Sequence, residues 1–227
     1  MMIETFKDQA LRKFGADPRI GGVLLTGSLA AGQADRFSDL DLIVVVRDEA
    51  YAEVMAERPA FAAGLGDLLA SFTGEHVGEP RLLICLFAMP FGDGLIHVDL
   101  KFVRATDLVV RVDEPIVLYD PDGLCAGALS KTEAVWPERD PQWFEDRFWI
   151  WLHYAAARLA RGERFEALST VNWIREQVLA PLTARRAGVP QRGLRHIESV
   201  APASIRLLDA TVSLNDSHGL WNALNQC

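Results

Sequence analysis

Leu24-Leu25-Thr26-Gly27-Ser28 and, after ten intervening residues, Asp39-Leu40-Asp41-Leu42-Ile43-Val44-Val45-Val46 are the stretches that decide the fold of this 227-residue chain. The first is an apolar run that ends at a Gly-Ser pair, and the second predicts a strand rich in β-branched residues. Residues two apart in a strand point to the same side, so Asp39 and Asp41 should project together. Adjacent carboxylates repel one another unless a cation lies between them, and Mg²⁺ prefers such oxygen ligands.

A third carboxylate, Asp99, lies on another predicted strand, Leu95 to Val103. Apolar and polar residues alternate along this stretch, which places Asp99 and Lys101 on the same face. If this strand lies beside the one that carries Asp39 and Asp41, the three carboxylates can hold two metal ions roughly 3.5–4 Å apart, as in-line phosphoryl displacement requires. Lys101 is then either a phosphate ligand or a solvated lysine, and the sequence leaves both interpretations open.

Gly27 and Ser28 stand where the first strand turns into a helix that we expect over Leu29 to Ala34. Free backbone N–H groups and the helix dipole at such a turn favour phosphate. Glycine lets the backbone approach closely, and the serine hydroxyl adds a donor. The pair therefore predicts a phosphate-binding turn beside the carboxylates.

This constellation resembles the nucleotidyltransferase superfamily typified by DNA polymerase beta. The family pattern is an apolar strand, Gly-Ser, about ten residues, an apolar-flanked Asp-x-Asp, and a third Asp on a later strand. Its positions are occupied here, one for one, by Gly27, Ser28, Asp39, Asp41 and Asp99. The resemblance covers about residues 20–104.

The resemblance implies transfer of a nucleoside monophosphate from a nucleoside triphosphate, usually ATP, with release of pyrophosphate. By this analogy Asp39 and Asp41 ligate both Mg²⁺ ions, Asp99 ligates the catalytic one, and Gly27 and Ser28 bind the β- and γ-phosphates.

The chain departs from the family pattern at one position near the Gly-Ser pair. Many short members read Gly-Ser-x-Ala-Arg-Gly, whereas Ala31 stands here where the arginine would be. Positive charge on the triphosphate must then come from elsewhere, with Arg36, Lys101 and an arginine of the second half as the candidates.

The remaining sequence predicts an α+β part, a mixed sheet with flanking helices, followed by an all-helical part. We expect a nucleotidyltransferase catalytic domain over residues 1–130 and a helical domain over 131–227. The layout resembles that of aminoglycoside and lincosamide nucleotidyltransferases, which implies that the helical domain forms an acceptor-side wall. The other predicted elements are a helix over Ile3 to Phe14, a helix over Ala50 to Phe72 interrupted at Pro59, a hairpin of strands 81–88 and 95–103 turning at 90–94, a strand near 115–119, and helices from about 140, over 164–187 and over 202–214.

Composition and charge narrow the class of protein. Half of the residues are apolar and about a quarter are charged, as in soluble globular chains. The longest apolar run, Leu82 to Phe91, is too short for a bilayer, and the start of the chain does not resemble a signal peptide. Three cysteines without a C-x-x-C pair favour a reduced setting, so we expect a cytoplasmic protein without a membrane partner.

The charge is unevenly distributed along the chain. Residues 1–130 hold 11 basic against 20 acidic residues, a net −9, whereas residues 131–227 hold 12 against 11, a net +1. A protein that wraps nucleic acid usually shows a basic field, so the distribution argues against a nucleic-acid partner. The acidic excess suits metal ions or a cationic small molecule, and surface solubility would explain it equally well.

These observations predict a Mg²⁺-dependent nucleotidyltransferase that uses ATP or another nucleoside triphosphate and modifies a hydroxyl of a small molecule. An aminoglycoside-like antibiotic is one candidate acceptor, which would make the protein an antibiotic-resistance enzyme. Two alternatives stay open: nucleotidylation of a protein or an RNA end, and a non-catalytic nucleotide-binding interaction module. The sequence leaves the general base, the preferred nucleobase and the choice between a monomer and a homodimer undetermined.

Overall fold

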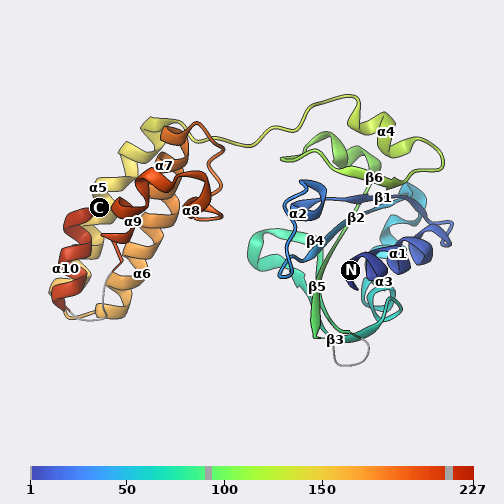
Figure 1. Ribbon diagram of the computed structural model, residues 1–227, viewed down its shortest axis with the longest axis horizontal. Coiled ribbons are helices and arrows are strands. Elements are labelled where there is room, and N and C mark those ends of the chain that lie inside the picture. The colour runs from blue at the N-terminus through green and yellow to red at the C-terminus, as the bar shows by residue number, and fades with distance from the viewer. Residues whose placement is uncertain (1, 90–93, 213–216) are drawn as a thin grey trace. The chain divides into compact units, whose positions relative to one another are not determined.

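A six-stranded mixed sheet forms the centre of the first part of the chain in the computed structural model, which describes residues 2–89, 94–212 and 217–227 (Figure 1). The strands follow one another across the sheet in the order β3-β4-β5-β2-β1-β6. Strands β2 and β5 run parallel, and the other neighbouring strands are antiparallel. Their bounds are β1 Ile20–Leu25, β2 Leu40–Val46, β3 Asp67–Gly74, β4 Glu79–Ala88, β5 Leu95–Val103 and β6 Ile116–Tyr119.

The chain divides into two compact units, Met1–Val135 and Trp136–Cys227. The first unit contains the sheet together with helices α1 Met2–Gly15, α2 Gly27–Ala30, α3 Tyr51–Ala63 and α4 Leu124–Leu129, and the 3₁₀ turns η1 Asp48–Ala50, η2 Glu75–Val77 and η4 Ala105–Val109. The second unit is helical among its described residues. The predicted fold class, an α+β sheet with flanking helices followed by a helical part, is therefore confirmed.

One face of the sheet is packed against α1 and α3 (Figure 1). Alternate residues of β2 and β5, such as Leu42 and Leu100, are fully buried there against aromatic side chains including Phe14. The second face carries a smaller cluster around Leu24 and Val45, covered by α4 and η4. Because strand residues alternate between faces, the odd-numbered residues of β2 and β5 point to this second face.

Part of the prediction for residues 50–72 was wrong. Helix α3 passes through Pro59 without interruption, and residues 67–74 form strand β3 instead of a helix. The proline takes away the donor for the carbonyl of Met55, but Arg58 Nε donates to that carbonyl at 2.9 Å. Strand β3 lies at one edge of the sheet and exposes most of its side chains, so its sequence lacks the apolar alternation of a half-buried strand.

The helix predicted over 29–34 is also shorter than expected and begins earlier. Helix α2 has four residues and starts at Gly27 itself. The predicted hairpin pairing of 81–88 with 95–103 is confirmed by β4 and β5, while residues 90–93 of its turn lie outside the described residues.

Residues 131–135 are attached to the first unit. Arg111, whose side chain is only 10% exposed, donates to the carbonyls of Leu129 and Thr132 and to the Thr132 hydroxyl. The N–H of Val135 donates to the Arg111 carbonyl at 2.9 Å. The first unit accordingly extends to Val135, and the assignment of domains to residues 1–130 and 131–227 stays a prediction.

The second unit begins with α5, which is capped by Asp140: its carboxylate accepts from the N–H of Gln142 at 2.7 Å. The predicted run 164–187 is helical throughout, with a π-helical turn just before Pro181. Within the predicted segment 202–214, residues 213–214 lie outside the described part. The elements are α5 Pro141–Ala160, α6 Arg164–Ile174, η5 Arg175–Leu179, α7 Ala180–Ala187, α8 Ile197–Val200, η6 Pro202–Ser204, α9 Ile205–Asp209 and α10 Ser217–Gln226. None of the helices within the described ranges is both long and apolar enough to cross a membrane.

Candidate functional site

Two of the predicted carboxylates are direct neighbours on the second face of the sheet. Strands β2 and β5 pair in parallel with Asp41 opposite Asp99, and both residues are half-buried. Asp39 immediately precedes β2; burial is the main cause that raises the pKa of Asp99, and the charge of Asp39 adds to it. Strands β2 and β5 are thus neighbours, which is the arrangement that the three-carboxylate prediction required.

Gly27 lies against the carboxylate of Asp41. The N–H of Thr26 donates to the Asp41 carbonyl at 3.0 Å, which ties the end of β1 to β2. Gly27 has φ +69°, and a Cβ at this position would lie 2.8 Å from the Asp41 carboxyl carbon and still closer to its Oδ2. Only glycine readily adopts this positive φ and also leaves room for the Asp41 carboxylate. The turn and the neighbouring carboxylate therefore both require glycine at this position.

The surroundings of Asp99 leave one carboxylate oxygen without a hydrogen bond. Its Oδ1 is buried and lies 3.1 Å from His97 Nε2, but the geometry of that contact does not make a hydrogen bond. Burial raises the pKa of Asp99, the charge of Asp39 raises it further, and His97 lowers it. Ile84, opposite Asp99 on β4, is a half-buried apolar neighbour. A buried oxygen beside a second carboxylate is an environment that a bound cation would stabilise.

Ser28 is the second site residue with an unsatisfied polar atom. Its Oγ is buried and has no hydrogen-bond partner within the described residues, although the Ser28 carbonyl accepts from the N–H of Gln33 at 2.9 Å. Because α2 has only four residues, the helix-dipole part of the prediction has no support. The groups of this turn that could bind a phosphate are therefore the Ser28 hydroxyl and the adjoining Gly27.

The carboxylates do not form a finished metal site. Across residues 2–89, 94–212 and 217–227, no three Asp, Glu, His or Cys side chains are arranged so as to hold a metal ion. The donors nevertheless fit a hard divalent cation, because Asp41 and Asp99 are adjacent and the buried Asp99 Oδ1 has a close contact with His97 but no hydrogen bond of good geometry within the described residues. The metal assignment of Asp39, Asp41 and Asp99 stays a prediction.

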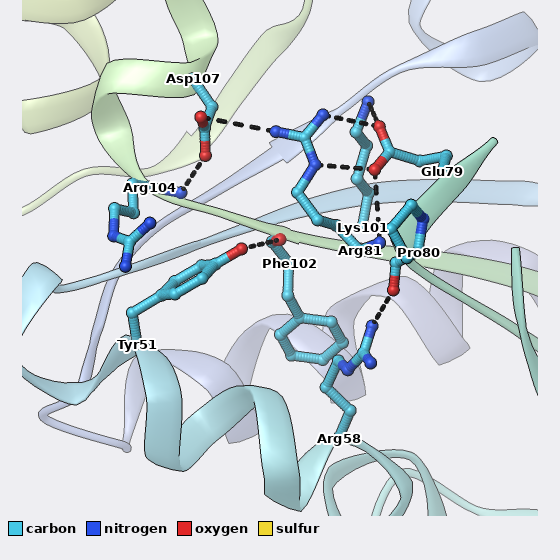
Figure 2. A network of polar contacts seen from close by, with 9 residues as sticks. All are labelled: Tyr51, Arg58, Glu79, Pro80, Arg81, Lys101, Phe102, Arg104 and Asp107. Atoms are coloured by element: carbon cyan, nitrogen blue, oxygen red, sulfur yellow. Dashed lines mark hydrogen bonds and ion pairs between the residues drawn. The ribbon is translucent and has the colours of Figure 1, made fainter. Parts of the chain in front are cut away.

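Lys101 shares the face of Asp99 but is engaged in an ion-pair network (Figure 2). Its Nζ lies 2.8 Å from Glu79 Oε2, and Arg81 binds both oxygens of Glu79 at 2.7 Å. Arg81 also reaches Asp107 of η4 at 3.4 Å. The network ties β4, β5 and η4 together. Sequence reasoning assigned no role to Glu79, since its contact with Lys101 depends on the pairing of β4 with β5 and its contact with Arg81 belongs to no motif.

Glu79 should make the stability of the protein depend on acid pH. Hydrogen bonds from Arg81, supported by Lys101, lower the pKa of Glu79 from 4.5 to about 2. Because the folded-state pKa lies below the unfolded one, the stabilisation is complete above the unfolded pKa. It is lost as the pH falls from 4.5 towards about 2. We expect Glu79→Gln to lose about 1–2 kcal/mol at neutral pH, and this difference to shrink below about pH 4.5.

The measurement is urea denaturation of both proteins between neutral pH and pH 3, with the exposed Glu133→Gln as control. A difference between wild type and Glu79→Gln that stays constant over the whole range would contradict the assignment.

A comparison with protein families identifies the chain. The family described as streptomycin adenylyltransferase matches residues 3–199, which is most of the sequence. The chain belongs to this family. The resemblance to the nucleotidyltransferase superfamily is thereby confirmed, and family membership assigns the protein to the enzymes that transfer a nucleotidyl group.

Solved structures of two further proteins are similar to this chain. One is a nucleotidyltransferase-like protein from Exiguobacterium sibiricum, with 12% identity and a TM-score of 0.41, matched over 98% of this chain and 72% of that chain. The other is an aminoglycoside 6-adenyltransferase from Bacillus subtilis, with 20% identity and a TM-score of 0.39, matched over 100% of this chain and 86% of that chain. A search among curated proteins found no match.

Proposed function

We propose that this family member transfers AMP from ATP to a hydroxyl group of a small molecule, with two Mg²⁺ ions bound and pyrophosphate released. The observation that carries the proposal is the pairing of Asp41 with Asp99, whose Oδ1 is buried and lies near His97 Nε2 at 3.1 Å without forming a hydrogen bond of good geometry. Gly27 supports the same site, because a side chain at this position would collide with the Asp41 carboxylate. The family match supports the type of transfer.

In this proposal each site residue has a stated task. Asp39 and Asp41 would hold both metal ions, and Asp99 would hold one of them. Bound Mg²⁺ supplies charge neutralisation on the phosphates and lowers the pKa of the acceptor hydroxyl. Gly27 allows the phosphate chain to approach the backbone, and the Ser28 hydroxyl donates to a phosphate oxygen. Lys101 would bind phosphate only by exchanging its ion pair with Glu79 for the ligand.

The acceptor that we propose is a polycationic, hydroxylated molecule such as an aminoglycoside. Residues 1–130 carry a net charge of −9, which attracts a cationic acceptor and repels an anionic one. The assignment of residues 131–227 to acceptor binding stays a prediction, as does the choice of ATP over the other nucleoside triphosphates.

The test is a pyrophosphate-release assay with Mg²⁺, each of the four common nucleoside triphosphates in turn, and a panel of hydroxylated acceptors. We expect release that requires ATP, Mg²⁺ and a cationic acceptor together, with a product heavier than the acceptor by one AMP group. Release with neutral or anionic acceptors alone would contradict the proposed acceptor class. Tight MgATP binding without release over the whole panel would favour a nucleotide-binding module instead.

A further inference from the structure

We propose that Arg36 binds the terminal phosphates of the nucleotide, an inference that rests on the proposed function. Arg36 is exposed in the loop that joins α2 to β2 and stands three residues before Asp39. Its guanidinium carbon lies 4.4 Å from the centre of the Phe37 ring. Within the described ranges, its side chain forms no hydrogen bond or ion pair with another residue.

The other cations near the sheet are already engaged. Between residues 26 and 104, each remaining Arg or Lys side chain that the structure describes contacts a carboxylate or a backbone carbonyl oxygen. These are Arg47 with Asp122, Arg58 with the Met55 and Pro80 carbonyls, Arg81 and Lys101 with Glu79, and Arg104 with Asp48. Arg36 differs from these five in contacting only an aromatic ring, which leaves its N–H donors available to an anionic ligand.

A hydrogen-bonded turn holds Arg36 and Phe37 in place. Asp35 Oδ1 accepts from the N–H of Phe37 at 2.8 Å, and Ser38 Oγ accepts from the N–H of Asp35 at 2.8 Å. The turn presents the Phe37 ring to solvent with 77% of the residue exposed. A ring this exposed adds little to the core, but it orients the guanidinium through a cation–π contact.

The same loop is connected to Ser28, whose hydroxyl is unsatisfied among the described residues. The N–H of Gln33 donates to the Ser28 carbonyl at 2.9 Å, and the N–H of Ala31 donates to the Gly27 carbonyl at 3.1 Å. The segment that carries Arg36 is therefore fastened to the Gly27–Ser28 turn at one end and leads into Asp39 at the other. A guanidinium offers paired N–H donors whose geometry matches phosphate oxygens. The ligand class is the polyphosphate chain of a nucleoside triphosphate.

The test measures binding by titration calorimetry, with inorganic tripolyphosphate, MgATP and AMP as separate ligands. We expect Arg36→Gln to weaken tripolyphosphate and MgATP roughly 10- to 100-fold, as loss of a charge-assisted hydrogen bond would, and to leave AMP binding unchanged. Phe37→Leu should weaken the same two ligands by a smaller factor, and Phe37→Tyr, which keeps the ring, should bind as the wild type does. Arg12→Gln is the matched control, because Arg12 is an exposed arginine of α1, which packs on the opposite face of the sheet.

The outcomes separate this inference from the proposed function. If the wild type binds MgATP and Arg36→Gln binds it equally well, the role of Arg36 is wrong while the proposed function stands. The role of Arg36 would also be wrong if Arg36→Gln weakened AMP binding as much as MgATP binding, because the effect would then not be specific for the phosphate chain. It would equally be wrong if Arg12→Gln weakened MgATP binding as much as Arg36→Gln does, because the effect would then not be specific for this loop. A wild type that binds neither MgATP nor tripolyphosphate would overturn both proposals.

Discussion

Asp41→Asn is expected to reduce nucleotidyl transfer by at least about a thousandfold, because it removes the carboxylate that lies between Gly27 and Asp99. An asparagine side chain has the same size but offers a neutral oxygen to a cation. We expect MgATP binding to weaken as well, and the melting temperature to stay within about 4 °C of the wild type. The measurements are pyrophosphate release at saturating acceptor, calorimetric titration of MgATP, and thermal unfolding.

The matched control for this experiment is Asp67→Asn, which neutralises an exposed aspartate of the edge strand β3. It should leave transfer and MgATP binding unchanged. The site assignment fails if Asp41→Asn and the parallel variant Asp39→Asn both bind metal and ATP as the wild type does. The same result would show that the adjacency of Asp41 and Asp99 has only a structural role.

Gly27→Ala is expected to damage both stability and activity, because two independent effects act on one residue. The backbone has φ +69°, where a residue with a side chain costs about 1–2 kcal/mol. The new Cβ would also meet the Asp41 carboxylate, with its carboxyl carbon 2.8 Å away, so that side chain must move. We expect a loss of about 2–4 kcal/mol in the free energy of unfolding and a fall in transfer rate of at least about a hundredfold.

Gly78→Ala is the matched control, since Gly78 has φ +73° but no described atom lies within 4 Å of the position that a Cβ would take. Gly78→Ala has the conformational cost of a positive φ but no collision with a neighbouring side chain. Its free energy of unfolding should therefore fall by only about 1–2 kcal/mol, and its transfer rate should not change. Urea denaturation and the pyrophosphate assay measure both quantities. Equal behaviour of the two alanine variants would mean that Gly27 serves the turn and not the position of Asp41.

The strand positions of Asp41 and Asp99 could be predicted from local pattern alone. Alternation with a period of two puts Asp39 and Asp41 on one face of a strand, and Asp99 on the polar face of another. The observed strand β5 spans the predicted residues, whereas β2 begins at Leu40, so Asp39 lies just before the strand. The pattern could not predict whether these two strands are neighbours, because pairing in a sheet joins segments that are far apart in the chain.

The edge of the sheet shows where local pattern fails. Residues 67–74 lack apolar alternation because most side chains of β3 are exposed, and their strand conformation depends on pairing with β4. Pro59 is a second example. A proline predicts a break in the helix because it leaves the carbonyl of Met55 without a backbone donor, but in α3 the side chain of Arg58 donates to that carbonyl.

The sequence by itself determined the class of fold, the strands that carry Asp41 and Asp99 and the face to which these two acids point, since these follow from the geometry of single strands and helices. Only the tertiary structure decided which groups meet. It placed Asp41 beside Asp99 and Gly27 against Asp41. It also joined Lys101 to Glu79, while Arg36 stayed in an exposed loop. Such partners are set by strand order and by contacts between distant segments, which the period of a sequence does not encode.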